Sequence, residues 1–262
     1  MISSDFRVEA RRRLTGKWGK VACITLAYCA IFFVLGFIEG LISRLLGLSN
    51  NSLIMAIINF VIEIPLTFGM IVALFKVYHS EDVKPFDFVS LGFGNFKKSI
   101  FVSLHILLKM IVPFILWIIS TVLIVFSSAS TVILAANYSS DGIVASSGIL
   151  FVAIILYIVS IIWLIVKSYS YQLSYITAID EPDLAAKEVV NKSEVLMKGN
   201  RGKLFFLEFS FIGWSILATF TFGIGFLWLV PYIQFAVFVF YDFVAKKDAK
   251  EETEVIVEES NQ

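Results

Sequence analysis

The sequence predicts an all-α polytopic membrane protein with six transmembrane helices arranged as three hairpins, and with both termini cytoplasmic. Three observations predict this fold. Hydrophobic residues make up 58% of the 262 residues and charged residues only 16%, whereas a soluble domain has about 25% charged residues. Apolar runs recur at lengths near the roughly 20 residues that a helix needs to cross a bilayer. Lys and Arg gather between alternate pairs of these runs.

The N-terminal segment, residues 1–20, is basic and amphipathic. It carries six Lys and Arg residues before a long apolar run begins at Val21, and it has no small-x-small site of a cleaved signal peptide. An apolar stripe at i,i+4 spacing runs beside these cations and consists of Phe6, Ala10, Leu14 and Trp18. Such a helix can lie in the interface of an anionic leaflet, so lipid head groups are the expected partner of the Arg/Lys cluster.

A membrane domain is expected over residues 21–244. Its six spans are predicted at residues 21–40, 53–75, 101–126, 148–168, 204–222 and 226–244. The last two come from one apolar region that we divide at Gly223-Ile224-Gly225. Because this turn is short, the two helices should be antiparallel neighbours.

The distribution of cations predicts the orientation. If the odd-numbered spans leave the cytoplasm, 19 of the 21 Lys and Arg residues fall in cytoplasmic segments, and only Arg44 and Lys109 do not. The external connection 127–147 has no cation at all. Cytoplasmic loops carry an excess of Lys and Arg, so both termini should lie inside.

Two further segments are expected on the cytoplasmic side. Residues 183–198 predict a short amphipathic helix, with Glu188 and Lys192 as an i,i+4 pair and Gly199 as the stop. Residues 245–262 are acidic, which predicts a disordered tail. The cytoplasmic loops are the expected place for a protein partner.

Glu63 is the strongest candidate for a functional residue inside the membrane. It lies at the centre of its span, where an acid is costly unless it is paired, protonated or exposed to water. Pro65 cannot donate to the helix, which predicts a kink two residues later. An acid beside a kink could bind a proton, a cation or a polar head group. A protonated glutamate that only packs against a neighbouring helix is the equally weighted alternative.

Three other polar residues lie in the predicted spans, near their cytoplasmic ends. His105 and Lys109 are four residues apart and share a helix face, and Glu208 could pair with Lys109. Snorkelling of the lysine and an interfacial position of the acid explain them without a function.

Catalytic and metal-binding patterns are absent from the sequence. The His and Cys residues have no metal-ligand spacing, and there is no HExxH, GxSxG or P-loop motif, so we expect no catalytic residue, metal or cofactor. Lys and Arg balance Asp and Glu at 21 each. This balance argues against a nucleic-acid partner.

The C-terminal half carries a motif that resembles a known family. Its residues include Lys198, Gly199, Asn200, Ser210, Gly213, Trp214, Gly223, Gly225, Trp228, Pro231 and Tyr232. With Leu14-Thr-Gly-Lys17-Trp18, they resemble the bacterial membrane protein family catalogued as domain of unknown function 975, over most of the chain. The family usually has Trp where Gly202 stands. The resemblance implies a multi-pass protein of the bacterial cytoplasmic membrane and implies no activity.

Two functions stay open. A non-catalytic scaffold, assembly factor or immunity-type protein would act through the cytoplasmic segments, and it is favoured because one central acid is thin support for a pathway. A small transporter or lipid-handling protein would use Glu63. A polar cavity that reaches Glu63 would favour transport, and a bundle packed tightly through its middle would favour the scaffold.

Overall fold

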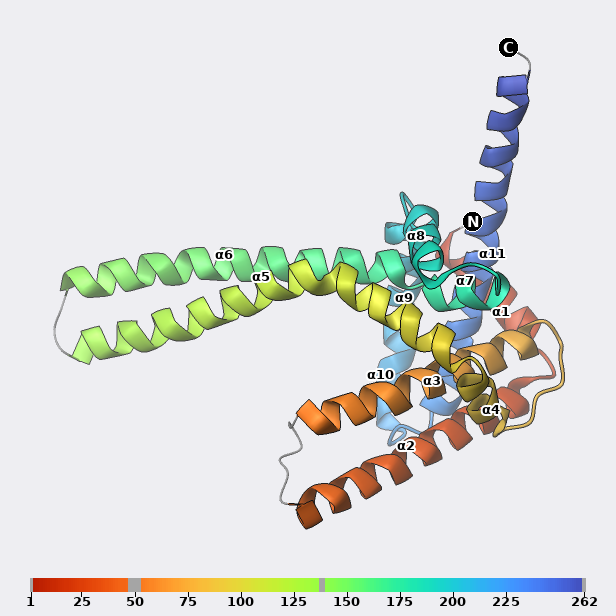
Figure 1. Cartoon of the computed structure of the whole chain (residues 1–262), viewed down its shortest axis with the longest axis horizontal. Coiled ribbons are helices and arrows are strands. Elements are labelled where there is room, and N and C mark those ends of the chain that lie inside the picture. The colour runs from red at the N-terminus through yellow and green to blue at the C-terminus, as the bar shows by residue number, and fades with distance from the viewer. Residues whose placement is uncertain (1, 47–52, 137–139, 261–262) are drawn as a thin grey trace. The chain divides into compact units, whose positions relative to one another are not determined.

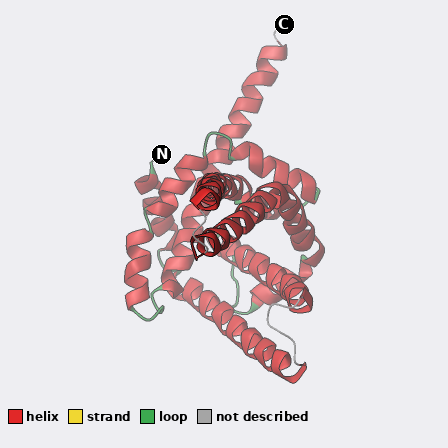
Figure 2. Cartoon of the chain, turned by 90° about the vertical axis from the view of Figure 1, so that its left-hand side faces the viewer, coloured by secondary structure: helices red, strands yellow, loops and turns green. Residues whose placement is uncertain are grey.

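The computed structural model describes residues 2–46, 53–136 and 140–260, which form helices and connecting loops (Figures 1 and 2). The helices are α1 Ser3–Leu14, α2 Trp18–Leu46, α3 Leu53–Tyr78, α4 Asp87–Gly94, α5 Phe96–Ala136, α6 Ser140–Tyr171, α7 Ser174–Asp180, α8 Ala186–Leu196, α9 Arg201–Phe209, α10 Ile212–Phe220 and α11 Phe226–Ser260. No strand occurs in these ranges. The predicted all-α class is confirmed.

Within the described ranges, six helical stretches are long and apolar enough to cross a membrane, as the sequence predicts. They are Trp18–Leu45, Ile57–Tyr78, Phe96–Leu134, Ser146–Asp180, Arg201–Phe220 and Phe226–Ala249. The fifth contains two helices, because α9 ends at Phe209 and α10 begins at Ile212. At this break the N–H of Phe211 donates to the carbonyl of Glu208, three residues back, which makes a tighter turn than an α-helix has.

The connection 127–147 and the acidic tail lie outside the predicted spans, and the structure extends helices into both. In the connection 127–147, α5 continues to Ala136 and α6 begins at Ser140, and the residues between them lie outside the described ranges. The Thr131 hydroxyl donates to the Ser127 carbonyl at 2.8 Å, so its polar group is satisfied within the helix.

The acidic tail is the second such segment. Helix α11 continues through it to Ser260, where the composition predicts disorder. Residues 245–255 consist mainly of Ala, Lys and Glu. These residues have high helix propensity, and extending an existing helix avoids the cost of nucleation. The expected disorder of the acidic tail stays a prediction, beside a structure that draws residues 245–260 as helix.

The chain forms two compact units. The larger unit comprises Met1–Ser103 and Gln172–Gln262, and the smaller comprises Leu104–Tyr171. In the smaller unit, residues with small side chains are buried at every seventh position of each helix. They are Pro113, Ser120 and Ser127 on α5 and Ser146, Ala153 and Ser160 on α6. Thr131 Oγ1 donates to Ser146 Oγ at 2.9 Å. Seven-residue spacing and small side chains allow two membrane helices to approach closely.

Helix α11 is the core of the larger unit. Its middle buries aromatic rings completely, including Phe235, Phe238 and Phe240. Phe238 packs edge-on against Phe75 in the last turn of α3, with 5.2 Å between ring centroids. Tyr232 packs against Trp18, the first residue of α2, with centroids 5.8 Å apart. Helix α11 therefore meets the α2/α3 pair at the start of α2 and the end of α3.

The N-terminal helix α1 lies on α11. Its predicted stripe is buried at Phe6, Ala10 and Leu14. The Phe6 ring meets Phe240 edge-on, with centroids 5.4 Å apart. Side chains buried in this way are not free to enter a lipid interface, so these three residues attach α1 to the protein.

A pair of glycines joins α4 to the middle of α3. A Cβ atom at Gly69 would lie 2.0 Å from the Phe88 carbonyl oxygen, and one at Gly92 would lie 2.1 Å from the Pro65 carbonyl oxygen. Only glycine fits at such a close backbone approach. The connection between the second and third predicted spans therefore includes a helix packed against a membrane-length helix.

Helix α8 lies within the segment predicted as a cytoplasmic helix. Its buried side contains Val189, Val190, Ser193 and Leu196. Gly199 follows with φ +77°, in keeping with the predicted stop. Lys192 Nζ lies 2.6 Å from Glu181 Oε1, so its ion pair is with Glu181 and not with the predicted Glu188. Glu188 instead accepts a hydrogen bond from the Ala185 N–H at the start of α8.

Candidate functional site

A cavity of about 340 Å³ lies in the larger unit, among α1, α2, α10 and α11. We call it the aromatic pocket. Its lining residues are Arg11, Trp18, Trp214, Leu217, Ala218, Thr221, Gly225, Trp228, Leu229 and Tyr232. Only one of them carries a charge, and four are aromatic. A concave, mostly apolar site with few polar groups is typical of small-molecule binding.

The turn between α10 and α11 shapes one wall of the pocket. The Thr221 hydroxyl accepts a hydrogen bond from the Gly225 N–H at 2.8 Å and donates to the Ala218 carbonyl at 2.7 Å. Gly223 has φ +85°. A Cβ atom at Gly225 would lie 2.9 Å from Ala218 Cα, so glycine is required for the close approach of the turn to α10.

Tyr232 links the pocket to α1. Its hydroxyl donates to the Arg7 carbonyl at 3.2 Å. Its ring meets Phe211 edge-on with centroids 5.0 Å apart. The guanidinium carbon of Arg11 lies 5.8 Å from the centroid of the same ring. Tyr232 therefore holds one wall of the pocket and places Arg11 at its edge.

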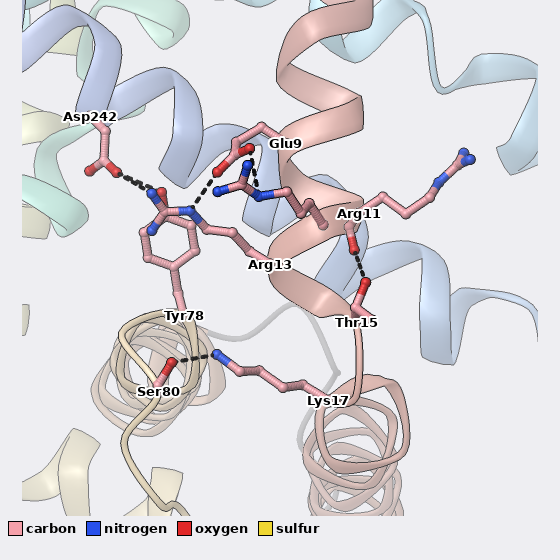
Figure 3. Close-up of polar contacts among 9 residues, drawn as sticks. Glu9, Arg11, Arg13, Thr15, Lys17, Tyr78, Ser80 and Asp242 are labelled. Carbon is pink, nitrogen blue, oxygen red and sulfur yellow. Dashed lines mark hydrogen bonds and ion pairs between the residues drawn. The ribbon is translucent and has the colours of Figure 1, made fainter.

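Two cations of the N-terminal segment, Arg13 and Lys17, have partners inside the protein (Figure 3). Arg13 Nε donates to Glu9 at 3.1 Å, and its guanidinium carbon lies 4.4 Å from the Tyr78 ring centroid. Lys17 Nζ donates to the Val77 carbonyl at 2.8 Å. These contacts attach α1 and the turn after it to the end of α3.

Two ionisable groups in this region, Lys17 and Asp82, have shifted pKa values. Burial lowers the pKa of Lys17, and the positive charges of Arg13 and Lys20 lower it further. Lys20 also forms an ion pair with Asp82. The hydrogen bond and the charge of Lys20 lower the pKa of the Asp82 carboxyl. Both groups belong to the attachment of α2 and α3 and not to the pocket.

Glu63 lies on α3 at a second, smaller cavity of about 150 Å³ between α2 and α3. Asn59, one turn before it, donates from Nδ2 to Glu39 Oε1 at 3.1 Å. One turn after it, the Thr67 and Tyr28 hydroxyls lie 3.1 Å apart. These residues form a polar series along α3. The next turn of α3 buries Met70 and Leu74, so the series ends near the middle of the helix.

The other predicted membrane residues have separate surroundings. Pro65 is buried in α3 beside α4. Lys109 lies in the smaller unit with its Nζ 5.4 Å from the ring centroid of Tyr171. His105 is on α5, one turn before it. Glu208 lies in the larger unit and accepts a hydrogen bond from Gln172. A Lys109–Glu208 pair would join the two units and stays a prediction.

Several residues of the predicted family motif converge on the aromatic pocket. Trp214 and Tyr232 line it, together with Trp18, Gly225 and Trp228. The remaining residues of the C-terminal motif have no place in the lining: Lys198, Gly199, Asn200, Ser210, Gly213, Gly223 and Pro231.

The contacts show a structural role for three of these motif residues: Asn200, Ser210 and Pro231. Asn200 donates to the Leu196 carbonyl at 3.0 Å, where α8 ends. The Ser210 carbonyl accepts a hydrogen bond from Arg7 Nη1 at 3.4 Å. Pro231 is buried inside α11, where it removes one helix hydrogen bond.

Sequence reasoning missed Arg11 as a separate functional candidate. It appeared only as one of six cations. The turn at Gly16, with φ +77°, interrupts the helical periodicity between Arg11 and Trp18. No spacing rule connects Arg11 with Trp214, which lies about 200 residues away in the chain.

Comparison with known proteins gives one match. The model of the family described as "Protein of unknown function (DUF975)" matches residues 1–248. This confirms the family resemblance drawn from the motif. No curated protein and no solved structure matches the chain.

Proposed function

Because the chain belongs to this family, whose function is unknown, we propose a role from the site itself: the protein is a non-catalytic membrane protein that binds a membrane lipid in the aromatic pocket. The carrying observation is the convergence of Trp18, Trp214 and Trp228 around a cavity of about 340 Å³. These residues come from α2, α10 and α11, so the pocket exists only in the folded larger unit.

The expected level of the pocket in the membrane supports a lipid ligand. Trp18 is the first residue of α2, directly before the apolar run that begins at Val21. Lys17 and Lys20 flank it, as cations do where a helix leaves the hydrocarbon. Trp and Tyr prefer this interfacial level because their rings are amphipathic. A lipid could place its chain against the rings and its head group towards water.

We also propose the orientation that the cation distribution predicts. Of the 21 Lys and Arg residues, 19 fall on the side of the two termini, which would be the cytoplasmic side of a bacterial plasma membrane. Arg11 and Trp18 belong to that side, so the pocket would open to the cytoplasmic leaflet, and the turn at Gly225 in its wall would lie near the same leaflet and not on the far side. A lipid there would come from the inner leaflet.

The scaffold function keeps one supporting observation. Helix α11 buries rings where it packs on the last turn of α3, including Phe235 and Phe238. This extensive packing between helices fits a binding or assembly role. Lipid binding is compatible with such a role, because a bound lipid adds contacts between α1, α10 and α11, and a protein partner could still bind at the loops.

Transport through Glu63 is the second candidate. The polar series of Glu39, Asn59 and Glu63 beside a small cavity favours it. The series ends near Thr67, so a complete pathway would need rearrangement of α3 and α4. We therefore rank transport below lipid binding.

The proposed function can be tested by counting bound lipid. The full-length protein is purified in detergent, and phosphatidylglycerol is titrated while native mass spectrometry counts the lipid retained. We expect one lipid that saturates at low lipid-to-protein ratio. Leu217→Trp should abolish it, because Leu217 lines the pocket and a larger ring would fill the space.

The matched control is Ile216→Trp. Ile216 is similarly exposed, at 54% against 58% for Leu217, and does not line the pocket. This variant should retain the lipid. Equal retention by both variants, or no saturable lipid on the native protein, would refute the proposed function.

A further inference from the structure

We propose that Arg11 is a specificity residue that selects a phospholipid with an anionic head group for the aromatic pocket. This inference rests on the proposed lipid binding and adds the chemistry of the ligand. The sequence predicts that the whole N-terminal Arg/Lys cluster attracts anionic lipid. The inference assigns this attraction to Arg11 alone.

The other cations of the cluster are held by groups inside the protein. Arg7 donates to the Ser210 carbonyl at 3.4 Å. Arg13 contacts Glu9 and Tyr78. Lys17 donates to the Ser80 hydroxyl at 2.9 Å as well as to a backbone carbonyl.

The last two cations also have acidic partners. Lys20 pairs with Asp82. Arg12 Nε lies 3.4 Å from Glu9 Oε2, and its side chain is 80% exposed on the protein surface. Neither residue lines the aromatic pocket. The surface charge of the cluster is therefore smaller than the sequence suggests.

Arg11 differs from all five, because in the part of the chain that the structure describes its guanidinium makes no hydrogen bond and no ion pair. Its guanidinium carbon lies 5.8 Å from the centroid of the Tyr232 ring. Figure 3 shows its side chain pointing away from the contacts of Glu9, Arg13 and Tyr78. It is the only charged residue of the pocket lining.

The chemistry of this arrangement fits a lipid phosphate. A guanidinium presents paired N–H donors that match two phosphate oxygens, and such charge-assisted bonds are roughly twice as strong as neutral ones. Arg11 lies at the edge of an apolar pocket, so one ligand can place an anionic head on Arg11 and its chain against Trp214 and Trp228. Inorganic phosphate has no chain and would gain nothing from the rings.

The test compares two lipids with identical acyl chains, anionic phosphatidylglycerol and zwitterionic phosphatidylcholine, in competition for the full-length protein in detergent. Retained lipid is counted by native mass spectrometry. We expect the native protein to prefer phosphatidylglycerol by about tenfold, and Arg11→Gln to lose this preference while still retaining one lipid. Arg11→Lys should keep part of the preference. Inorganic phosphate should not displace the lipid.

Arg12→Gln is the matched control, because it removes the same charge one residue away. It should keep the preference. If Arg11→Gln and Arg12→Gln lose the preference for phosphatidylglycerol equally, surface potential alone attracts the lipid. If Arg11→Gln keeps the preference, other residues recognise the head group. Either result overturns the inference. Displacement by inorganic phosphate would overturn it as well.

The two proposals fail differently. If lipid binding itself is wrong, the native protein retains no saturable lipid of either class. If only the role of Arg11 is wrong, the lipid is retained and Leu217→Trp still removes it, while Arg11→Gln leaves the ratio of the two lipids unchanged.

Discussion

The guanidinium of Arg13 lies over the ring of Tyr78, with 4.4 Å between the guanidinium carbon and the ring centroid. The Tyr78 hydroxyl donates a 2.6 Å hydrogen bond to Asp242 on α11. One tyrosine therefore connects α1, α3 and α11. A cation held over an aromatic face and a charged hydrogen bond each stabilise such a contact.

Tyr78→Phe should lower the free energy of unfolding by about 1–2 kcal/mol, because it removes a hydrogen bond to a carboxylate and keeps the ring under Arg13. Reversible unfolding in mixed detergent micelles measures this loss. Tyr28→Phe is the control, because its hydroxyl meets the neutral Thr67 at 3.1 Å and should cost less. The opposite order of the two variants would contradict the assigned importance of the Tyr78–Asp242 bond.

Gly92→Ala should destabilise the protein by about 1–3 kcal/mol, because the added methyl group would overlap the Pro65 carbonyl and push α4 away from α3. Gly94→Ala in the same helix is the control, since a Cβ there meets nothing within 4 Å. The melting temperatures of both variants, measured by thermal unfolding, test this prediction. Equal melting temperatures would mean that α4 does not pack on α3.

Glu63→Gln should leave lipid retention and any growth phenotype of the deletion unchanged, because Glu63 lies at the α2/α3 cavity and not at the aromatic pocket. Glu63→Leu should cost about 0.5–2 kcal/mol, the scale of one hydrogen bond inside a membrane. Complementation of the deletion strain and unfolding in detergent measure the two effects. A folded Glu63→Gln protein that fails to complement would favour transport, since glutamine cannot exchange a proton.

The orientation can be tested by cysteine labelling after Cys23 and Cys29 have been replaced by alanine. A cysteine at Ser139 should react with an impermeant reagent from outside the cell, and one at Lys187 only after permeabilisation. Lys187 is exposed on α8, whereas the neighbouring Ser193 is fully buried and unsuitable. Ser139 lies outside the described residues and is chosen from the cation distribution alone. The reverse labelling pattern would invert the proposed topology.

The sequence by itself determined the number of membrane-length helices and the place of several local features. Hydropathy is a property of consecutive residues, so six apolar stretches could be read directly from the chain. The stop at Gly199 follows from glycine's tolerance of positive φ. Helix α8 follows from its own apolar side and from the glycine that stops it.

Tertiary structure decided which partner each polar residue chooses and where the site lies. Lys192 pairs with Glu181 and not with Glu188, because the approach of α7 and α8 places another carboxylate nearer. The stripe of Phe6 and Leu14 faces α11, although its amphipathic pattern fits a lipid surface equally well. A local pattern gives the polarity of a helix face and not the identity of what covers it.

The aromatic pocket is the clearest case of the same limit. The residues that line it come from opposite ends of the sequence, Arg11 and Trp18 from one and Trp214 and Trp228 from the other. Taken singly, each is typical of a membrane interface. The crossing of α11 with the start of α2, and the packing of α1 on α11, bring them to one cavity. Long-range packing determines this convergence, and no periodicity within a single helix encodes it.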